Sequence, residues 1–103
     1  VRQPSTYKMP YLLINATSLG LRASDPLPLS LPALRVLKPR LFMDMIYRPA
    51  TTAFMKTMKK QGARSANGLE MLLLQGARSF EIWTRRKPPL GTMRRALKKE
   101  IYG

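Results

Sequence analysis

The segment "LFMDMIYRPATTAFMKTMKKQG", residues 41 to 62, joins a buried strand to an amphipathic helix. Its first part, "LFMDMIY", is nearly continuous in apolar residues, which is typical of strands in a parallel sheet. Thr51 or Thr52 then caps a helix whose lysines lie on one face and whose apolar side chains lie on the other, namely Phe54, Met55 and Met58. This strand and helix predict an α/β fold with a parallel sheet.

The flanking sequence supplies the other elements. "YLLIN", residues 11–15, and "ARSAN", residues 63–67, are short strand candidates. Prolines alternate with leucines from Leu21 to Pro39, which indicates an extended connection with one helical turn near residues 32–37. Two helices are expected at the end of the chain, over residues 68–84 and, after a Thr92 cap, to residue 102. The fold class is therefore α/β, a partial parallel sheet followed by two C-terminal helices, with too few strands to protect both sheet edges.

The composition is strongly basic. Nineteen Lys and Arg face five Asp and Glu, a net charge of +14, and the chain has no Cys and no His. The absence of both residue types removes disulfides, thiolate nucleophiles and the commonest metal ligands, so we predict no metal site. The charge favours polyanionic partners. No run approaches the roughly 18 apolar residues of a membrane span, and we expect a cytoplasmic or organelle-interior protein without a membrane partner.

Four short stretches carry polar groups where a ligand could bind. "NATSLGL", residues 15–21, follows a strand, and ligands of open α/β sheets gather beyond the carboxyl ends of strands. "DMIY" ends the next strand with the phenol of Tyr47, and Gly68 opens a helix where bare backbone can approach a ligand. Gln75 lies about two turns farther along that helix. Taken singly, the first two stretches are better explained as a hydrogen-bonded turn and a half-buried Tyr, and Gly68 is equally well explained as part of a plain helix cap.

Together, the four stretches resemble one family, the NADP-dependent shikimate dehydrogenases of aromatic amino-acid biosynthesis. The resemblance covers the C-terminal part of that family, from about residue 11 to residue 97, and rests on "LLINATSLGL", "DMIYRPATTAF", "QGARSANGLEMLLLQGARSFEIWT" and "MRRAL" in the right order. It implies that residues 1–67 are the C-terminal part of a Rossmann-like NADP-binding domain. Residues 68–103 would be C-terminal helices that pack against a substrate domain absent from this chain.

The resemblance also implies roles for single residues. Thr17, Met45 and Gly68 would bind NADP, with Met45 packed against the nicotinamide, while Tyr47 and Gln75 would bind shikimate. The family's Gly-rich phosphate-binding turn and its catalytic Lys and Asp have no counterpart here, so no catalytic residue is assigned. The chain is expected to contribute positioning residues for the reduction of 3-dehydroshikimate to shikimate and to be inactive alone.

Two positions depart from the family pattern. Glu70 stands where many members carry Gly, which puts a charge near the cofactor edge, and Arg85 stands where Gly usually follows "WT".

An alternative function is that of a catalytically inactive basic protein that binds RNA, for instance in a ribosomal particle. The motivation is the net charge of +14 and the crowding of cations near the end of the chain. The residues that would neutralise phosphates are Arg85, Arg86, Lys87, Arg94, Arg95, Lys98 and Lys99.

Overall fold

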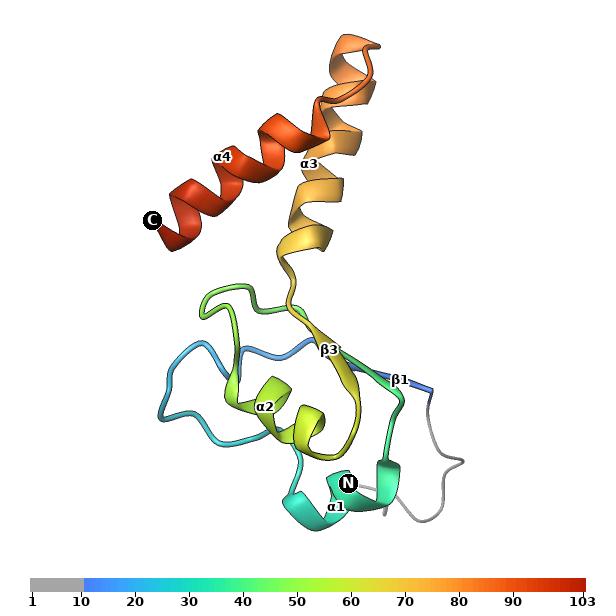
Figure 1. Cartoon of the computed structure of the whole chain (residues 1–103), viewed down its shortest axis with the longest axis vertical. Coiled ribbons are helices and arrows are strands. Elements are labelled where there is room, and N and C mark those ends of the chain that lie inside the picture. The colour runs from blue at the N-terminus through green and yellow to red at the C-terminus, as the bar shows by residue number, and fades with distance from the viewer. Residues whose placement is uncertain (1–10) are drawn as a thin grey trace. The chain divides into compact units, whose positions relative to one another are not determined.

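A parallel sheet lies at the centre of the first part of the chain. The structure, a computed structural model, describes residues 11–103. Within these residues the sheet contains β1 (Leu12–Asn15), β2 (Leu41–Asp44) and β3 (Arg64–Ala66), in that order, and Figure 1 shows the helices that connect them. All pairs are parallel, with Leu12 opposite Leu41 and Leu41 opposite Arg64. The predicted α/β class is confirmed.

Two short helices connect the strands. The connection from β1 to β2 contains α1 (Leu31–Leu37), which Ser30 caps by accepting the Ala33 amide at 3.3 Å. The connection from β2 to β3 contains α2 (Ala53–Lys60), and its cap is Thr52, whose hydroxyl accepts the Met55 amide at 3.1 Å. The sequence had left Thr51 and Thr52 open as candidates.

One face of the sheet carries the hydrophobic core. Phe42 on β2 meets Phe54 on α2 with ring centroids 4.3 Å apart, at an interplanar angle of 34°. Leu34 of α1 and Met58 of α2 are fully buried in the same cluster. These side chains come from the apolar faces of both helices, so the amphipathic pattern of residues 53–60 determines which side of the sheet α2 covers.

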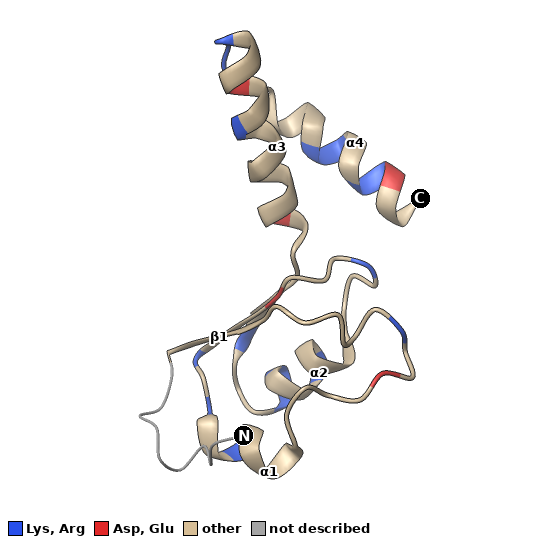
Figure 2. Ribbon diagram, turned by 180° about the vertical axis from the view of Figure 1, so that it is seen from behind, with Lys and Arg blue, Asp and Glu red and all other residues tan. Residues whose placement is uncertain are grey.

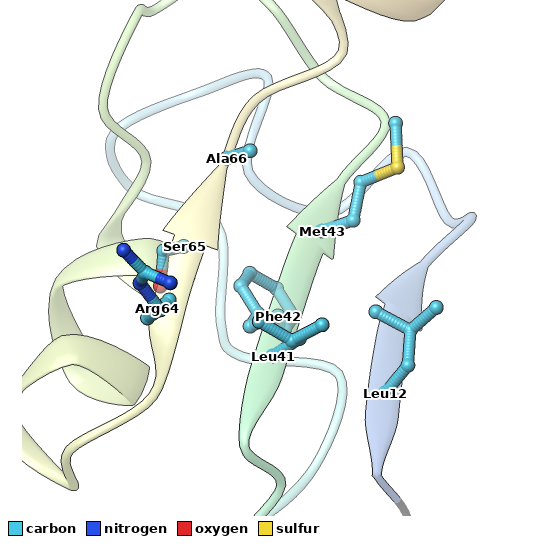
Figure 3. A pocket seen from close by; sticks show the side chains of 7 residues that line it. All are labelled: Leu12, Leu41, Phe42, Met43, Arg64, Ser65 and Ala66. Carbon is cyan, nitrogen blue, oxygen red and sulfur yellow. The ribbon is translucent and has the colours of Figure 1, made fainter.

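The other face of the sheet is partly open to solvent. Leu12 and Ile14 remain 47% and 46% exposed on β1. A hollow of about 350 Å³ on the sheet, shown in Figure 3, has as its lining Leu12, Leu41, Phe42, Met43, Arg64, Ser65 and Ala66. None of these lining residues is a predicted site residue, and a parallel sheet normally has both faces covered. The hollow is therefore an incompletely covered surface of the sheet.

The chain divides into two compact units, Val1–Asn67 and Gly68–Gly103. The second unit is a pair of helices, α3 (Leu69–Thr84) and α4 (Leu90–Tyr102), that pack against each other. No helix in residues 11–103 is long and apolar enough to cross a membrane.

Two predicted boundaries were wrong. The helix α4 begins at Leu90 with Pro89 as its cap, three residues before the predicted cap at Thr92, and the Met93 amide donates to the Pro89 carbonyl at 3.0 Å. Proline is tolerated there because the first amides of a helix have no partner inside it. The strand β2 ends at Asp44 rather than Tyr47, because the Asp44 carboxylate accepts the Ile46 amide at 3.1 Å and turns the chain out of the sheet.

Truncating Phe42 to Ala should lower the free energy of unfolding by about 3–5 kcal/mol, because it removes a buried ring and leaves a cavity against Phe54. Urea denaturation followed by circular dichroism measures the change. The matched control is Val36→Ala on the exposed face of α1, which should cost less than about 1 kcal/mol. Equal losses in the two variants would contradict the assignment of the core to this face.

Candidate functional site

Buried polar side chains lie at the carboxyl ends of the first two strands. Asn15 ends β1 and Asp44 ends β2, and the two residues are opposite each other in the parallel register. Their side chains are 3% and 0% exposed. Because the carboxyl ends of parallel strands are where open α/β sheets bind ligands, we define this region, together with the loops that follow each strand, as the carboxyl edge.

Asn15 fixes the loop that follows β1. Its amide nitrogen Nδ2 donates to the Leu19 carbonyl and to Asp44 Oδ1, both at 3.1 Å. Its oxygen Oδ1 accepts the Thr17 amide at 3.0 Å and the Thr17 hydroxyl at 2.7 Å. All four hydrogen-bonding positions of one buried amide are therefore used, three of them within its own loop.

Asp44 connects the same network to helix α2. Its Oδ1 accepts from Asn15 and from the Ile46 amide, and its Oδ2 accepts the Thr52 hydroxyl at 2.7 Å. The Thr52 oxygen in turn accepts the Met55 amide at 3.1 Å, so the cap of α2 is also the partner of the carboxylate. A buried carboxylate needs such donors to offset its loss of hydration. The Asn15, Asp44 and Thr52 side chains thus join β1, β2 and α2.

The far end of the first loop is held by a second carboxylate. Asp25 Oδ2 accepts the Gly20 amide at 3.1 Å and the Arg22 amide at 3.0 Å. These hydrogen bonds, from Arg22 first and Gly20 second, lower the pKa of Asp25. Gly20 itself has φ of 120°, and a Cβ placed on it would lie 3.1 Å from Ile46 Cδ1. Glycine is required here by its backbone conformation and by the close approach of the Ile46 side chain.

The carboxyl edge brings two of the predicted cofactor residues together. The Met45 amide donates to the Asn15 carbonyl at 3.1 Å, while Thr17 donates to the Asn15 side chain. Both side chains are accessible, since Thr17 is exposed and Met45 is 42% exposed. Tyr47, two residues beyond Met45, is half-buried. Asn67, after β3, donates to the Ala50 carbonyl at 2.8 Å and so holds the loop that carries Tyr47.

Gly68 and Gln75 belong to the second unit. Gly68 is the cap residue of α3, it is buried, and its carbonyl accepts the Leu72 amide at 3.0 Å. Its φ of −81° is accessible to any residue, so helix capping does not by itself require glycine. Gln75 is exposed on α3, which leaves its amide accessible to a ligand. The roles assigned to these two residues by resemblance stay predictions.

The two departures from the family pattern acquire structural explanations. Glu70 is exposed and paired with Arg94 of α4, whose Nε and Nη2 donate to the two carboxylate oxygens at 2.8 and 3.0 Å. This hydrogen-bonded pair lowers the pKa of Glu70 and raises that of Arg94. Arg85 ends α3 in a left-handed conformation with φ of 57°, its amide donating to the Glu81 carbonyl at 2.8 Å. Glycine adopts that conformation at lower cost.

The cations of the RNA-binding alternative lie on the second unit, and Figure 2 shows basic residues along α4. Arg94 is paired with Glu70, whereas the remaining members of the set are exposed: Arg85, Arg86, Lys87, Arg95, Lys98 and Lys99. An exposed basic face is the ordinary surface of a basic protein. RNA binding therefore stays a prediction.

Sequence reasoning named Thr52 only as one of two cap candidates and missed the other residues that hold the edge in place, namely Asn15, Asp25, Asp44 and Asn67. A usable signal was present, because Asn15 and Asp44 are the polar residues that close otherwise apolar strands. Such a residue at the end of a buried strand must find hydrogen-bond partners, and a neighbouring strand end is the nearest source.

Known proteins are similar to this chain in sequence and fold. The family described as Shikimate 5'-dehydrogenase C-terminal domain matches residues 68–98. A shikimate dehydrogenase (NADP(+)) of Methanococcus aeolicus is 42% identical over 88 residues, which cover 84% of this chain and 31% of that protein. The chain thus spans less than a third of the length of this relative.

Solved structures agree with the sequence comparison. Shikimate 5-dehydrogenase from Thermus thermophilus, in complex with NADP(H) and shikimate, is 34% identical to this chain with a TM-score of 0.75. The match covers 86% of this chain and 33% of the Thermus protein. The ligand-free 5-ketofructose reductase of a Gluconobacter strain is 33% identical to this chain with a TM-score of 0.71. That match covers 87% of this chain and 32% of the reductase. The same fold therefore occurs in proteins named for different substrates.

Replacing Thr52 by Val should destabilise the first unit by about 2 kcal/mol or more, because it removes the cap of α2 and leaves Asp44 Oδ2 without its hydroxyl donor. Thr52→Ser should recover most of the loss, and Thr51→Val, at the exposed neighbour, should have little effect. Urea denaturation midpoints measure all three. A loss in Thr51→Val as large as in Thr52→Val would contradict the assignment of Thr52 as the cap.

The Glu70 carboxyl should titrate below its ordinary pKa of 4.5, and Arg94→Met should bring its pKa back toward that value. Because the pKa is lowered in the folded chain, the ion pair stabilises the fold above the ordinary value and loses this contribution as the pH falls below it. A carbon-detected NMR titration of the Glu carboxyl groups measures the shift. Arg95→Met is the control on the same helix and should leave the Glu70 pKa unchanged.

Proposed function

We propose that this chain, which corresponds in sequence and fold to the C-terminal part of shikimate dehydrogenases, provides the cofactor- and substrate-positioning residues of an NADP-linked oxidoreductase. The reaction would be the reduction of 3-dehydroshikimate to shikimate. The observation that carries the proposal is the carboxyl edge, where a buried network places Thr17 and Met45 around one residue, Asn15. NADP is a ligand of solved relatives with the same fold, and one of these complexes also contains shikimate.

The cofactor would bind through Thr17, Met45 and Gly68. Met45 offers an accessible thioether at the end of β2, which suits contact with a flat aromatic ring such as nicotinamide. Gly68 begins α3, where the backbone can approach a ligand closely because no side chain intervenes. NADP would supply the hydride chemistry, and the residues of this chain would hold the ring in place.

The substrate would bind through Tyr47 and Gln75. The phenol of Tyr47 and the amide of Gln75 both donate and accept hydrogen bonds, which suits the hydroxyl groups of shikimate. The 5-ketofructose reductase of Gluconobacter shares the fold and is named for a different substrate, so the fold alone does not determine the substrate. Positioning of this kind contributes to catalysis by reducing the freedom of the two reactants.

The two compact units would divide these tasks. We assign Val1–Asn67 to the C-terminal part of a Rossmann-like NADP-binding domain, and Gly68–Gly103 to helices that pack against a substrate domain. The glycines of the chain show no G-x-G spacing after a strand, so the pyrophosphate would be bound by residues outside this sequence. The chain would therefore position the reactants without completing the catalytic machinery.

The purified 103-residue chain should not oxidise shikimate with NADP, because it lacks the family's catalytic Lys and Asp motifs. Formation of NADPH, followed by its absorbance, measures turnover, and any rate above that of a protein-free blank would contradict this prediction.

NADP should nevertheless bind at the carboxyl edge. In a two-dimensional NMR titration, NADP should shift the amide signals of Thr17 and Met45. Adenosine 2',5'-bisphosphate, which carries phosphates but no nicotinamide, should leave both signals in place. The control matters because a net charge of +14 attracts any phosphate. Equal shifts with both ligands, or shifts confined to the lysines and arginines, would overturn the proposed cofactor site.

A further inference from the structure

The hydrogen bonds around Asn15 can run in one direction only. Its Nδ2 faces the Leu19 carbonyl, which has no hydrogen to donate, and Asp44 Oδ1, which already accepts the Ile46 amide. Its Oδ1 faces the Thr17 amide, which can only donate. A flipped side-chain amide would oppose donor to donor and acceptor to acceptor at these positions. The surroundings therefore determine the orientation of the Asn15 side chain.

This orientation fixes the hydrogen of the Thr17 hydroxyl. The Thr17 oxygen lies 2.7 Å from Asn15 Oδ1, which carries no hydrogen, so the hydroxyl must donate to it. The same oxygen accepts the Leu19 amide at 3.1 Å. A hydroxyl has one hydrogen and two lone pairs, so one lone pair of Thr17 is left for a ligand. Thr17 is exposed, and toward a ligand it can act only as a hydrogen-bond acceptor.

Asp44 is a positioning residue in this arrangement. It contributes no group to the exposed surface, since it is fully buried, but its Oδ1 holds the NH₂ end of Asn15 on the side away from Thr17. The polarity of an exposed hydroxyl on the β1 loop is thus determined by a carboxylate at the end of the neighbouring strand. Hydrogen bonds linked in this way also strengthen one another.

We propose that Thr17 recognises the carboxamide of the nicotinamide ring by accepting one of its N–H groups, and that it discriminates against a carboxylate at the same position. The inference rests on the proposed cofactor site. In that site the ring would pack against Met45, whose amide donates to the Asn15 carbonyl, and Thr17 donates to the side chain of the same residue, so Thr17 is the hydroxyl that we assign to the ring's substituent. The carboxamide is the group on the nicotinamide ring that donates hydrogen bonds, whereas a carboxylate offers only acceptors and would oppose the free lone pair.

Two mononucleotides test the proposal directly. Nicotinamide mononucleotide and nicotinic acid mononucleotide share ribose and phosphate and differ in carrying a carboxamide or a carboxylate. In NMR titrations of the full chain, the Met45 and Thr17 amide signals should report binding of nicotinamide mononucleotide about tenfold tighter, a ratio on the order of one discriminating hydrogen bond. Non-specific attraction predicts the opposite order, because the net charge of +14 favours the more anionic acid.

Three variants locate the preference in one hydroxyl. Thr17→Val should bring the two affinities within about twofold of each other, because it removes the acceptor and keeps the branched shape. Thr17→Ser should keep the preference for the amide, and Ser18→Ala, at the adjacent exposed hydroxyl, should leave it unchanged. The amide signals of Met55 and Ile46, which depend on Thr52 and Asp44, report whether each variant keeps the folded edge.

The outcomes separate this inference from the proposed function. Equal affinities in the unmodified chain, tighter binding of the acid, or an undiminished preference in a folded Thr17→Val would overturn the role of Thr17 while leaving the cofactor site intact. No shift at Met45 or Thr17 with either mononucleotide, even at millimolar concentration, would overturn the proposed site and this inference with it.

Discussion

The carboxylate of Asp44 is the group on which the arrangement of the carboxyl edge depends. It is fully buried and receives hydrogen bonds from Asn15, Ile46 and Thr52, which belong to three different segments of the chain. A carboxylate that loses its hydration must be satisfied by other donors, so these segments hold their positions only together. The same interactions end β2, start α2 and fix the loop after β1. In this way the need to satisfy one buried group also places the exposed side chains of Thr17 and Met45.

The sequence predicts the parts of this structure that depend on neighbouring residues, and it does not predict contacts between residues far apart along the chain. The strands around Ile14 and Phe42 and the helix around Met58 were predicted, because local periodicity and apolar runs determine them. The contact between Asn15 and Asp44 was not, because it requires knowing that β1 and β2 are neighbours in parallel register. The pairing of Glu70 with Arg94 was also missed, since the residues are 24 positions apart on different helices.

The candidate site was predicted in a different way. Thr17, Met45 and Tyr47 came from motifs and resemblance, whereas the structure adds the reason that their loops have fixed shapes. The relative named 5-ketofructose reductase shares the fold at 33% identity, so the fold is compatible with more than one substrate. The network of Asn15, Asp44 and Thr52 is buried, so these side chains shape the edge without themselves meeting a ligand. In the proposed function the edge would hold the cofactor, and the accessible side chains of Tyr47 and Gln75 would contact the substrate.

The net charge of +14 makes the polarity of single groups more important for recognition. A positive field raises the local concentration of every phosphate-bearing molecule, so it increases encounter without distinguishing one nucleotide from another. Specificity must then come from groups with a fixed donor or acceptor character, and the Thr17 hydroxyl acquires that character through Asn15. Glu70 is compatible with this requirement, because its charge is paired with Arg94 at two hydrogen-bonding positions. The ion pair also removes Arg94 from the set of unpaired cations, so the acidic residue that departs from the family pattern reduces the charge that attracts phosphates without distinguishing between them.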